Sequence, residues 1–192
     1  MCGIVGLFAK STEIEDGLGV HLTAMLAQMS NRGPDSAGVA VYRDPAPLGS
    51  SKLTLYSADP NQHWGAVCDE LSDAFGGEHE PSVRGSHAVV LVDADAAQAE
   101  AWVRRHLPEL RVMSAGSVIE IYKEVGLPEV FAEQFHLTDL QGTHALGHTR
   151  MATESAVTPD RAHPFTAGED WCLVHNGSLS NHYQIRRKLE PL

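Results

Sequence analysis

The residues CGIVGLFA (Cys2–Ala9) follow Met1 and place a reactive thiol at the second position of the chain. The apolar run, in which Gly3 and Gly6 permit close approach of other backbone segments, is typical of a buried strand. In one interpretation Cys2 is a small hydrophobic residue at the start of that strand. In the other, Met1 is removed and Cys2 carries both a thiol and a free α-amine, which can serve as its general base.

Hydrophobic periodicity extends the pattern on both sides of a polar loop. Residues 20–29 carry apolar side chains at helical spacing and predict a helix, and residues 39–42 predict a second short strand. The loop between them, residues 31–38, reads NRGPDSAG and contains several residues that favour turns. The preceding residues 10–17 are polar and are expected to form a turn.

The middle of the chain predicts a separate unit. Residues 43–80 are rich in Pro, Gly, Ser and Asp, with a weakly helical stretch at 64–75. The pattern that follows resembles half of a ferredoxin-like unit, with a strand, a helix and two further strands expected at 86–92, 96–107, 110–114 and 118–124. Strand-like residues at 142–149 and 170–175 and a closing helix near 181–189 complete the expected elements.

Composition excludes several classes of protein. The 192 residues include 43% hydrophobic residues and carry a net charge of -11, which argues against nucleic acid or an anionic membrane surface as the partner. No apolar stretch approaches the length of a membrane span. The three cysteines form no CxxC pair, so neither a disulfide framework nor a zinc cluster is expected. With no secretory leader recognised, we expect a cytoplasmic protein.

Three short motifs contain candidate functional residues. His175-Asn176-Gly177 ends an expected strand, where an Asn amide and a Gly N–H can together bind an oxyanion; an Asn-Gly hairpin turn is the alternative. Residues 147–153 (GHTRMAT) contain Arg150, which can bind a carboxylate through two hydrogen bonds or form a surface salt bridge. The loop 31–38 is either a site loop or a turn rich in Pro and Gly.

Taken together and in this order, the motifs CGIVG, RGPDSAG, GHTRMAT and VHNG resemble the class II glutamine amidotransferase domain, a family of N-terminal-nucleophile hydrolases. The resemblance covers roughly residues 2–42 and 140–189. The longer segments HTRMATES, AHPF and HNGSLSNH are most similar to those of the glutaminase-type subunits of glutamate-synthase-related and N-methylglutamate synthase complexes.

The resemblance implies a fold and a set of site residues. We expect an α+β fold, a four-layer αββα sandwich, as one domain over residues 1–192 with a peripheral insertion at about 43–135. The insertion is either a partner-docking surface or a decoration. Cys2 would attack the glutamine side-chain amide, with its α-amine handling the protons, while Asn176 and Gly177 form the oxyanion hole. Arg150 would bind the substrate α-carboxylate, Thr153 would contact the substrate, and Arg32 would support the nucleophile's surroundings.

Some positions depart from the family pattern. Met151 stands where many relatives have an aromatic residue, and Glu154 where several have His. By the same resemblance the family has an acidic residue, roughly 20–30 residues after HNG, that binds the substrate ammonium. Glu190 lies too early for that position, and the sequence ends at Leu192. We therefore expect the chain to be C-terminally incomplete. A copy that retained Met1 would have its α-amine on the wrong residue and should be inactive.

The implied function is a glutaminase subunit that hydrolyses L-glutamine, or a related γ-amide, and passes ammonia to a synthase partner in a hetero-oligomer. By the same resemblance, FMN and iron–sulfur clusters would belong to the partner, and this chain would hold no cofactor. The eleven histidines include His144 and His148, but on a strand-like segment they need not converge, so no metal site is assigned. The alternative is a catalytically silent subunit that keeps the fold for assembly or regulation. Sugar-phosphate, phosphoribosyl or asparagine-forming acceptors remain a further possibility.

Overall fold

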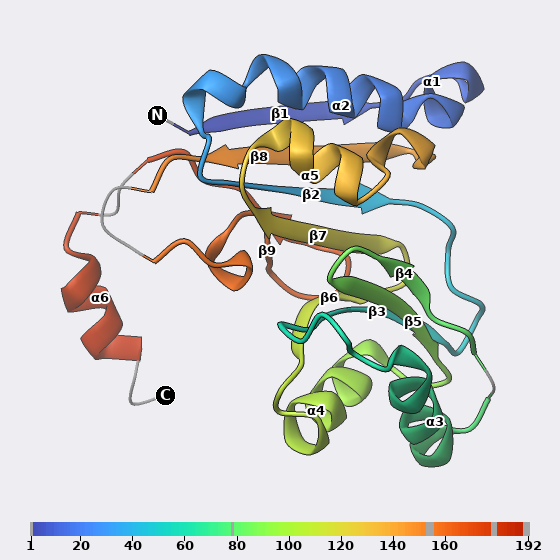
Figure 1. Ribbon diagram of the computed structural model, residues 1–192. Helices are drawn as coiled ribbons and strands as arrows, with labels where there is room; N and C mark the ends of the chain where they lie inside the picture. Colours follow the sequence, from blue (N-terminus) through green and yellow to red (C-terminus); the bar gives the residue numbers. More distant parts are fainter. Residues whose placement is uncertain (1, 78, 153–155, 178–179, 190–192) are drawn as a thin grey trace.

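The computed structural model describes residues 2–77, 79–152, 156–177 and 180–189, which are arranged around two four-stranded antiparallel sheets. The first sheet has the order β1-β8-β2-β7, with β1 (Gly3–Phe8), β8 (His144–Arg150), β2 (Ser36–Tyr42) and β7 (Ile119–Val125). Strands from both ends of the sequence therefore lie side by side (Figure 1). The expected α+β class is confirmed. The strand expected at the N-terminus is β1, but it is not buried as a whole: it is an edge strand in which Gly3 and Val5 are buried, while Ile4 and Phe8 are exposed.

Two helices cover one face of the first sheet, α2 (Leu18–Gln28) and α5 (Pro128–Gln134). Their apolar side chains join those of alternate strand residues in one core, which includes Leu22, Val39 and Tyr122. Gly19 of α2 is required by close packing, because a Cβ there would lie 1.9 Å from the Leu137 carbonyl oxygen. The predicted helix at 20–29 is thus confirmed, starting two residues earlier than expected.

The second sheet is a complete ferredoxin-like unit rather than half of one. Its order is β4-β5-β3-β6, and its elements follow the βαββαβ sequence of that motif. The elements are β3 (Ser51–Tyr56), α3 (Trp64–Phe75), β4 (Ser82–Arg84), β5 (His87–Val92), α4 (Ala96–His106) and β6 (Arg111–Gly116). The expectation of half a unit missed β3 and β4, because β3 (SKLTLY) follows a stretch dense in turn residues and β4 has only three residues.

The two helices of this unit pack on one face of its sheet. Asp95 caps α4 by accepting hydrogen bonds from Ala97 and Gln98, and basic residues occupy the last turn, where they complement the helix dipole. The core beneath the helices is formed by alternate residues of the strands, such as Leu53, Leu55 and Val90. Figure 1 shows α3 and α4 at the far end of the molecule from α2.

The opposite face of the second sheet packs on β7, the edge strand of the first. Strand β7 was expected to belong to the ferredoxin-like unit, but it pairs with β2. Its outward backbone N–H groups are hydrogen-bonded to side chains: Ile119 to Asp170, Ile121 to Thr54, and Lys123 to His87. The structural counterpart of the expected insertion is therefore the 51–116 unit, while β7 and α5 complete the first sheet and its helical cover. A four-layer αββα sandwich needs two sheets that pack face to face, whereas this unit packs on an edge strand of the first sheet. The four-layer arrangement therefore stays a prediction.

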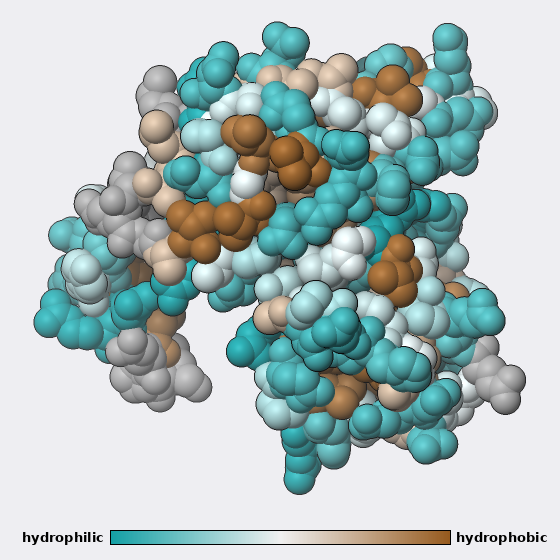
Figure 2. Space-filling model, viewed as in Figure 1, coloured by the Kyte–Doolittle hydropathy of each residue, from teal (hydrophilic) through white to brown (hydrophobic). Residues whose placement is uncertain are grey.

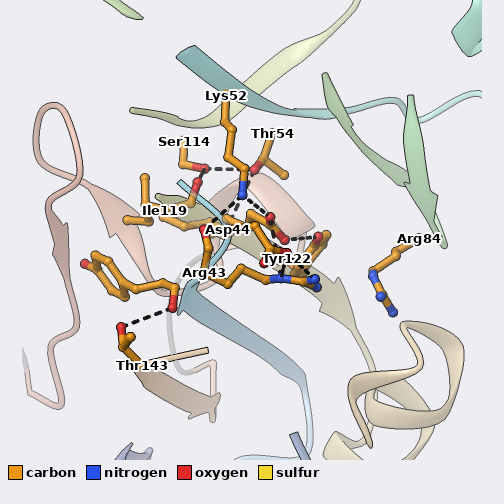
Figure 3. A network of polar contacts seen from close by, with 12 residues as sticks. Arg43, Asp44, Lys52, Thr54, Arg84, Ser114, Ile119, Tyr122 and Thr143 are labelled. Carbon is orange, nitrogen blue, oxygen red and sulfur yellow. Dashed lines mark hydrogen bonds and ion pairs between the residues drawn. The ribbon is translucent and has the colours of Figure 1, made fainter. Parts of the chain in front are cut away.

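The contact between the second sheet and β7, here called the seam, also contains a buried ion pair; Figure 3 shows Lys52 and Tyr122 from this network. Lys52 of β3 lies 2.6 Å from Glu120 of β7, and both side chains are more than nine-tenths buried. Tyr122 donates a hydrogen bond to the second oxygen of Glu120 at 2.8 Å. Lys52 also donates to the Arg43 carbonyl oxygen. The charge of each partner is thus compensated where the two sheets meet.

The remaining elements connect these layers. They are α1 (Thr12–Asp16), η1 (Ser30–Arg32), η2 (Leu137–Asp139), η3 (Pro159–Arg161), β9 (Phe165–Thr166), β10 (Cys172–Leu173) and α6 (His182–Leu189). Helix α1 replaces the turn expected at 10–17, because Ser11 caps it by accepting a hydrogen bond from Ile14. Helix α6 lies apart from both sheets (Figure 1). No helix in the described part of the chain is long and apolar enough to cross a membrane.

Candidate active site

The pairing of β1 with β8 brings the N-terminal thiol to the end of the GHTRMAT motif. Gly3 is opposite Thr149 in the register, so Cys2 lies beside the residues that follow Arg150. The Met151 backbone N–H donates to the Cys2 sulfur at 3.4 Å. An N–H group aimed at sulfur stabilises negative charge there. Cys2 is only partly buried, so its thiol is open to a substrate.

The HNG motif meets the same residue from the other side. The Asn176 side-chain amide donates to the Cys2 carbonyl oxygen at 2.8 Å, across 174 positions of sequence. An amide nitrogen carries two hydrogens, so one bond to Cys2 leaves a second donor for a ligand. Gly177 follows directly, and a Cβ there would lie 3.1 Å from the His175 ring. The structure therefore brings Cys2 and the predicted oxyanion residues together.

Asp35 of the NRGPDSAG loop fixes the strand end that faces Cys2. Its carboxylate accepts from the Ala152 backbone N–H at 2.7 Å, and its own N–H donates to the Arg150 carbonyl oxygen at 3.1 Å. Gly33 lets the loop approach β8, because a Cβ there would be 2.4 Å from the Thr149 carbonyl carbon. The loop thus holds the segment that carries the Met151 N–H in place. Sequence reasoning identified this loop but not Asp35.

Arg150 ends β8 and is 8% exposed. Its guanidinium donates to the Ala156 carbonyl oxygen at 3.2 Å. Arg150 directly precedes Met151, whose backbone N–H contacts the Cys2 thiol. Arg32 is on the exposed η1 turn, where its side chain makes no hydrogen bond or ion pair with the described residues. Thr153 and Glu154 lie outside the described residues.

A group of polar side chains lies beneath the HNG motif, on the face of the first sheet opposite α2. His148 of β8 is 1% exposed, and its Nε2 lies 3.2 Å from the His175 carbonyl oxygen. The His163 ring packs on it, with centroids 4.5 Å apart. Lys123 lies on the same face, 4.8 Å from the centroid of the Phe165 ring. Gly38 separates Lys123 from His148 in the register and leaves room for the His163 carbonyl oxygen, which would be 2.2 Å from a Cβ there.

Burial controls the protonation of this group. It lowers the pKa of His163 to about 4, with smaller contributions from the charges of His148 and Lys123. The pKa of His148 is lowered by burial as well. Burial also lowers the pKa of Lys123 to about 8. The two imidazoles are therefore neutral at neutral pH.

The described residues contain no group of three or more His, Cys, Asp or Glu side chains placed to hold a metal ion. In particular, His144 stacks on Tyr42 and bonds Thr143, whereas His148 faces His163 and His175. The two histidines thus have different neighbours although both belong to β8.

Comparison with known proteins supports the resemblance inferred from the motifs. A scan against models of known protein families finds no match. The chain is 48% identical over 190 residues to the glutamine amidotransferase-like protein GlxB of Rhizobium meliloti, a match that covers 98% of this chain and 62% of that protein. A putative glutamine amidotransferase of Methanothermobacter thermautotrophicus is 30% identical over 214 residues, covering 99% and 65%. The chain is similar over nearly its whole length to glutamine amidotransferases.

A shorter match has a more specific name. The glutamine–fructose-6-phosphate aminotransferase of Idiomarina loihiensis is 30% identical over 79 residues, which are 41% of this chain and 13% of that enzyme. The chain spans a little under two thirds of the length of the first two relatives. Similarity to glutamine amidotransferases is thereby confirmed.

Proposed function

We propose that this chain is a class II glutamine amidotransferase domain that hydrolyses the side-chain amide of glutamine through Cys2. The observation that carries the proposal is the meeting of three distant segments at one residue: Met151 donates its N–H to the Cys2 sulfur, and Asn176 donates its side-chain amide to the Cys2 carbonyl oxygen. A core cysteine at the start of a strand needs neither contact. The similarity to glutamine amidotransferases supports the same conclusion.

The chemistry follows from these groups. With Met1 removed, the α-amine of Cys2 takes the thiol proton, and the sulfur attacks the amide carbon of glutamine. The carbonyl electron pair moves to oxygen, where the second N–H of Asn176 and the backbone N–H of Gly177 would hold the oxyanion. When the carbon–nitrogen bond breaks, the leaving nitrogen receives the proton from the α-amine and departs as ammonia. Water then hydrolyses the γ-glutamyl thioester, which gives glutamate and restores the thiol.

The amino-acid end of the substrate needs a separate binding group. Arg150, at the end of the strand that faces Cys2, would bind the α-carboxylate through its planar guanidinium. Thr153 and Arg32 are proposed as further contacts on the strength of the family resemblance alone. The chain itself would need no cofactor for this acyl transfer.

The acceptor of the ammonia is proposed from the same resemblance. We propose a glutamate-synthase-like or N-methylglutamate-synthase-like partner in a hetero-oligomer, in which redox cofactors such as FMN and iron–sulfur clusters belong to the partner. The placement of Cys2 toward solvent is compatible with a substrate that enters from outside the domain.

Intact-mass measurement and peptide mapping, with and without an electrophilic glutamine analogue, test the hydrolase. We expect loss of Met1 and a single adduct on Cys2, with Cys68 and Cys172 as internal controls in the same molecule. The Cys2→Ser variant should lose the adduct, and Cys172→Ser should keep it. A folded protein that retains Met1, or gives no adduct on Cys2, would contradict the proposal and favour the silent subunit.

A further inference from the structure

The loop that carries Asn176 is attached to the first sheet at two points. At one, the Asn176 amide donates to the carbonyl oxygen of Cys2, before β1. At the other, Nε2 of His148 lies 3.2 Å from the carbonyl oxygen of His175. The register places His148 opposite Ile4 of β1, so both attachment points lie on neighbouring strands. The backbone next to Asn176 is therefore fixed from below by one buried side chain.

The chemistry of this contact defines the state of the imidazole. A carbonyl oxygen only accepts, so Nε2 must carry the proton. The other nitrogen, Nδ1, is buried and has no hydrogen-bond partner among the described residues. A neutral imidazole tolerates this arrangement better than a charged one, which would bury an additional N–H without an acceptor.

Neighbours from several elements support the neutral form. The His163 ring lies against His148, and its Nδ1 is also buried without a partner among the residues described. Burial is the largest cause that lowers the pKa of His148, and the charges of Arg150 on the same strand and of His175 above lower it further, whereas the hydrogen bond to the His175 carbonyl oxygen raises it. Lys123 of β7 acts in the same direction on His163. The surroundings of His148 are thus those of a fixed hydrogen-bond donor rather than of a proton acceptor in the reaction.

We propose that His148 is a positioning residue for the oxyanion hole, which acts through the His175 carbonyl oxygen to hold the Asn176 amide at Cys2. The inference rests on the proposed amide hydrolysis and adds a residue to it. His148 touches no reacting atom, so its effect is on geometry. An oxyanion donor acts mainly in the transition state, and its displacement should reduce kcat with little change in KM.

The test compares three variants in the full chain. His148→Phe keeps an aromatic ring of similar size and removes the donor, whereas His148→Gln replaces the ring with an amide that can still donate. His144→Phe is the matched control, because His144 is on the same strand but stacks on Tyr42, away from the HNG motif. Glutamine hydrolysis gives kcat and KM, and alkylation by iodoacetamide reports the reactivity of Cys2 without an oxyanion.

We expect His148→Phe to lower kcat by about 10- to 100-fold, part of the loss seen when an oxyanion donor is removed outright. KM should change by less than about threefold, and the alkylation rate should match the wild type. His148→Gln should recover most of the activity, and His144→Phe should behave as the wild type. Unchanged kcat in a folded His148→Phe, or an equal loss in His148→Gln, would overturn the proposal.

Two measurements separate this proposal from the proposed function. Imidazole ¹⁵N shifts in the wild type should show His148 protonated at Nε2, and the opposite tautomer would overturn the positioning role whatever the activity. Amide hydrogen exchange at residues 175–177 should be faster in His148→Phe than in the wild type, and equal rates would contradict it. If the wild type formed no acyl-enzyme with glutamine, the proposed function would fail, and the exchange rates would still decide whether His148 holds the loop.

Discussion

The backbone N–H of Lys123, on the edge strand β7 of the first sheet, donates to Nε2 of His87 at 3.4 Å. An imidazole of the second sheet thus accepts a hydrogen bond that a neighbouring strand would otherwise accept. The bond requires an unprotonated Nε2. Burial lowers the pKa of His87 to about 3, and the charge of Lys123 contributes. This histidine therefore stays an acceptor throughout the neutral and mildly acidic range.

Acid should weaken the fold through His87. An unfolded His titrates near pH 6.5, so between about pH 6.5 and pH 3 the unfolded chain binds a proton that the folded chain does not. The free energy of unfolding should fall as pH falls through that window and receive no contribution from His87 above it. Between pH 7 and pH 5 the wild type should lose up to about 2 kcal/mol more than His87→Gln in chemical denaturation. A variant of the exposed His21 is the control and should lose as much stability as the wild type between pH 7 and pH 5. A wild type that lost no more than His87→Gln would contradict the prediction.

The hydrogen bond between the Asp35 carboxylate and the Ala152 N–H should contribute to both stability and activity. Asp35→Ala leaves the Ala152 N–H without its acceptor and frees the segment that aims the Met151 N–H at Cys2. We expect a loss of about 1.5–3 kcal/mol in unfolding free energy, the usual value for a hydrogen bond to a charged group. Glutamine hydrolysis should fall with it. Asp35→Asn keeps an acceptor oxygen and should lie between the two, whereas an Asp35→Ala protein as active and stable as the wild type would refute the role.

Two glycine substitutions should have effects of opposite sign. Gly33→Ala puts a methyl group 2.4 Å from the Thr149 carbonyl carbon, which forces the site loop away from β8 and should cost at least about 1–3 kcal/mol. Gly65→Ala, in the first turn of α3, meets nothing closer than the His63 ring at 3.6 Å. Alanine is the better helix former, so this change should stabilise the protein by up to about 1 kcal/mol. Thermal unfolding measures both, and similar melting temperatures for the two variants would show the close contact to be unimportant.

Removal of one member of the buried pair Lys52 and Glu120 should lower the unfolding free energy more than replacement of both members by uncharged residues. Lys52→Met removes the nearer of the two cations beside the buried Glu120 carboxylate and leaves only Arg43, 4.0 Å away, which should destabilise by up to about 3–5 kcal/mol. In the double variant Lys52→Met with Glu120→Gln, residue 120 carries no charge and its amide oxygen can still accept from Tyr122. Much of the lost unfolding free energy should therefore be regained. The exposed pair of Glu100 and Arg104 is the matched control, with an expected effect below about 1 kcal/mol. Additive losses in the double variant would contradict the coupling.

The sequence predicts the elements whose signals are local. The helices expected at 64–75 and 96–107 are α3 and α4, the latter ending at His106, because their apolar residues recur at helical spacing. Strand β1 was recognised from its short apolar run. Strand β3 could not be recognised, since it follows turn residues and its polar Lys52 and Thr54 face a buried seam. Which sheet β7 joins depends on its pairing with β2, between residues 77 to 89 positions apart, and no local pattern records that.

The same limit applies to the site. Motif order identified Cys2, Arg150, Asn176 and Gly177, and the structure brings the first and third into contact. The roles of Asp35 and His148 depend on hydrogen bonds to backbone atoms of distant segments, which the identity of those residues does not reveal. Asp35 lies in a loop already suspected, so its carboxylate could have been suggested from the turn residues around it. For His148 only its position before Thr149 and Arg150 gave a hint.

The seam along β7 has a consequence for any shortened form of the chain. Its outward N–H groups at Ile121 and Lys123 donate to side chains of the second sheet, and these side chains cannot themselves extend the ladder. If residues 51–116 were cut out, the first sheet would expose an unpaired edge with free donors, ready to add a strand from another molecule. The ferredoxin-like unit thus covers this edge, and we expect a shortened chain that lacks the unit to aggregate along β7 unless that edge is given new charges or a proline.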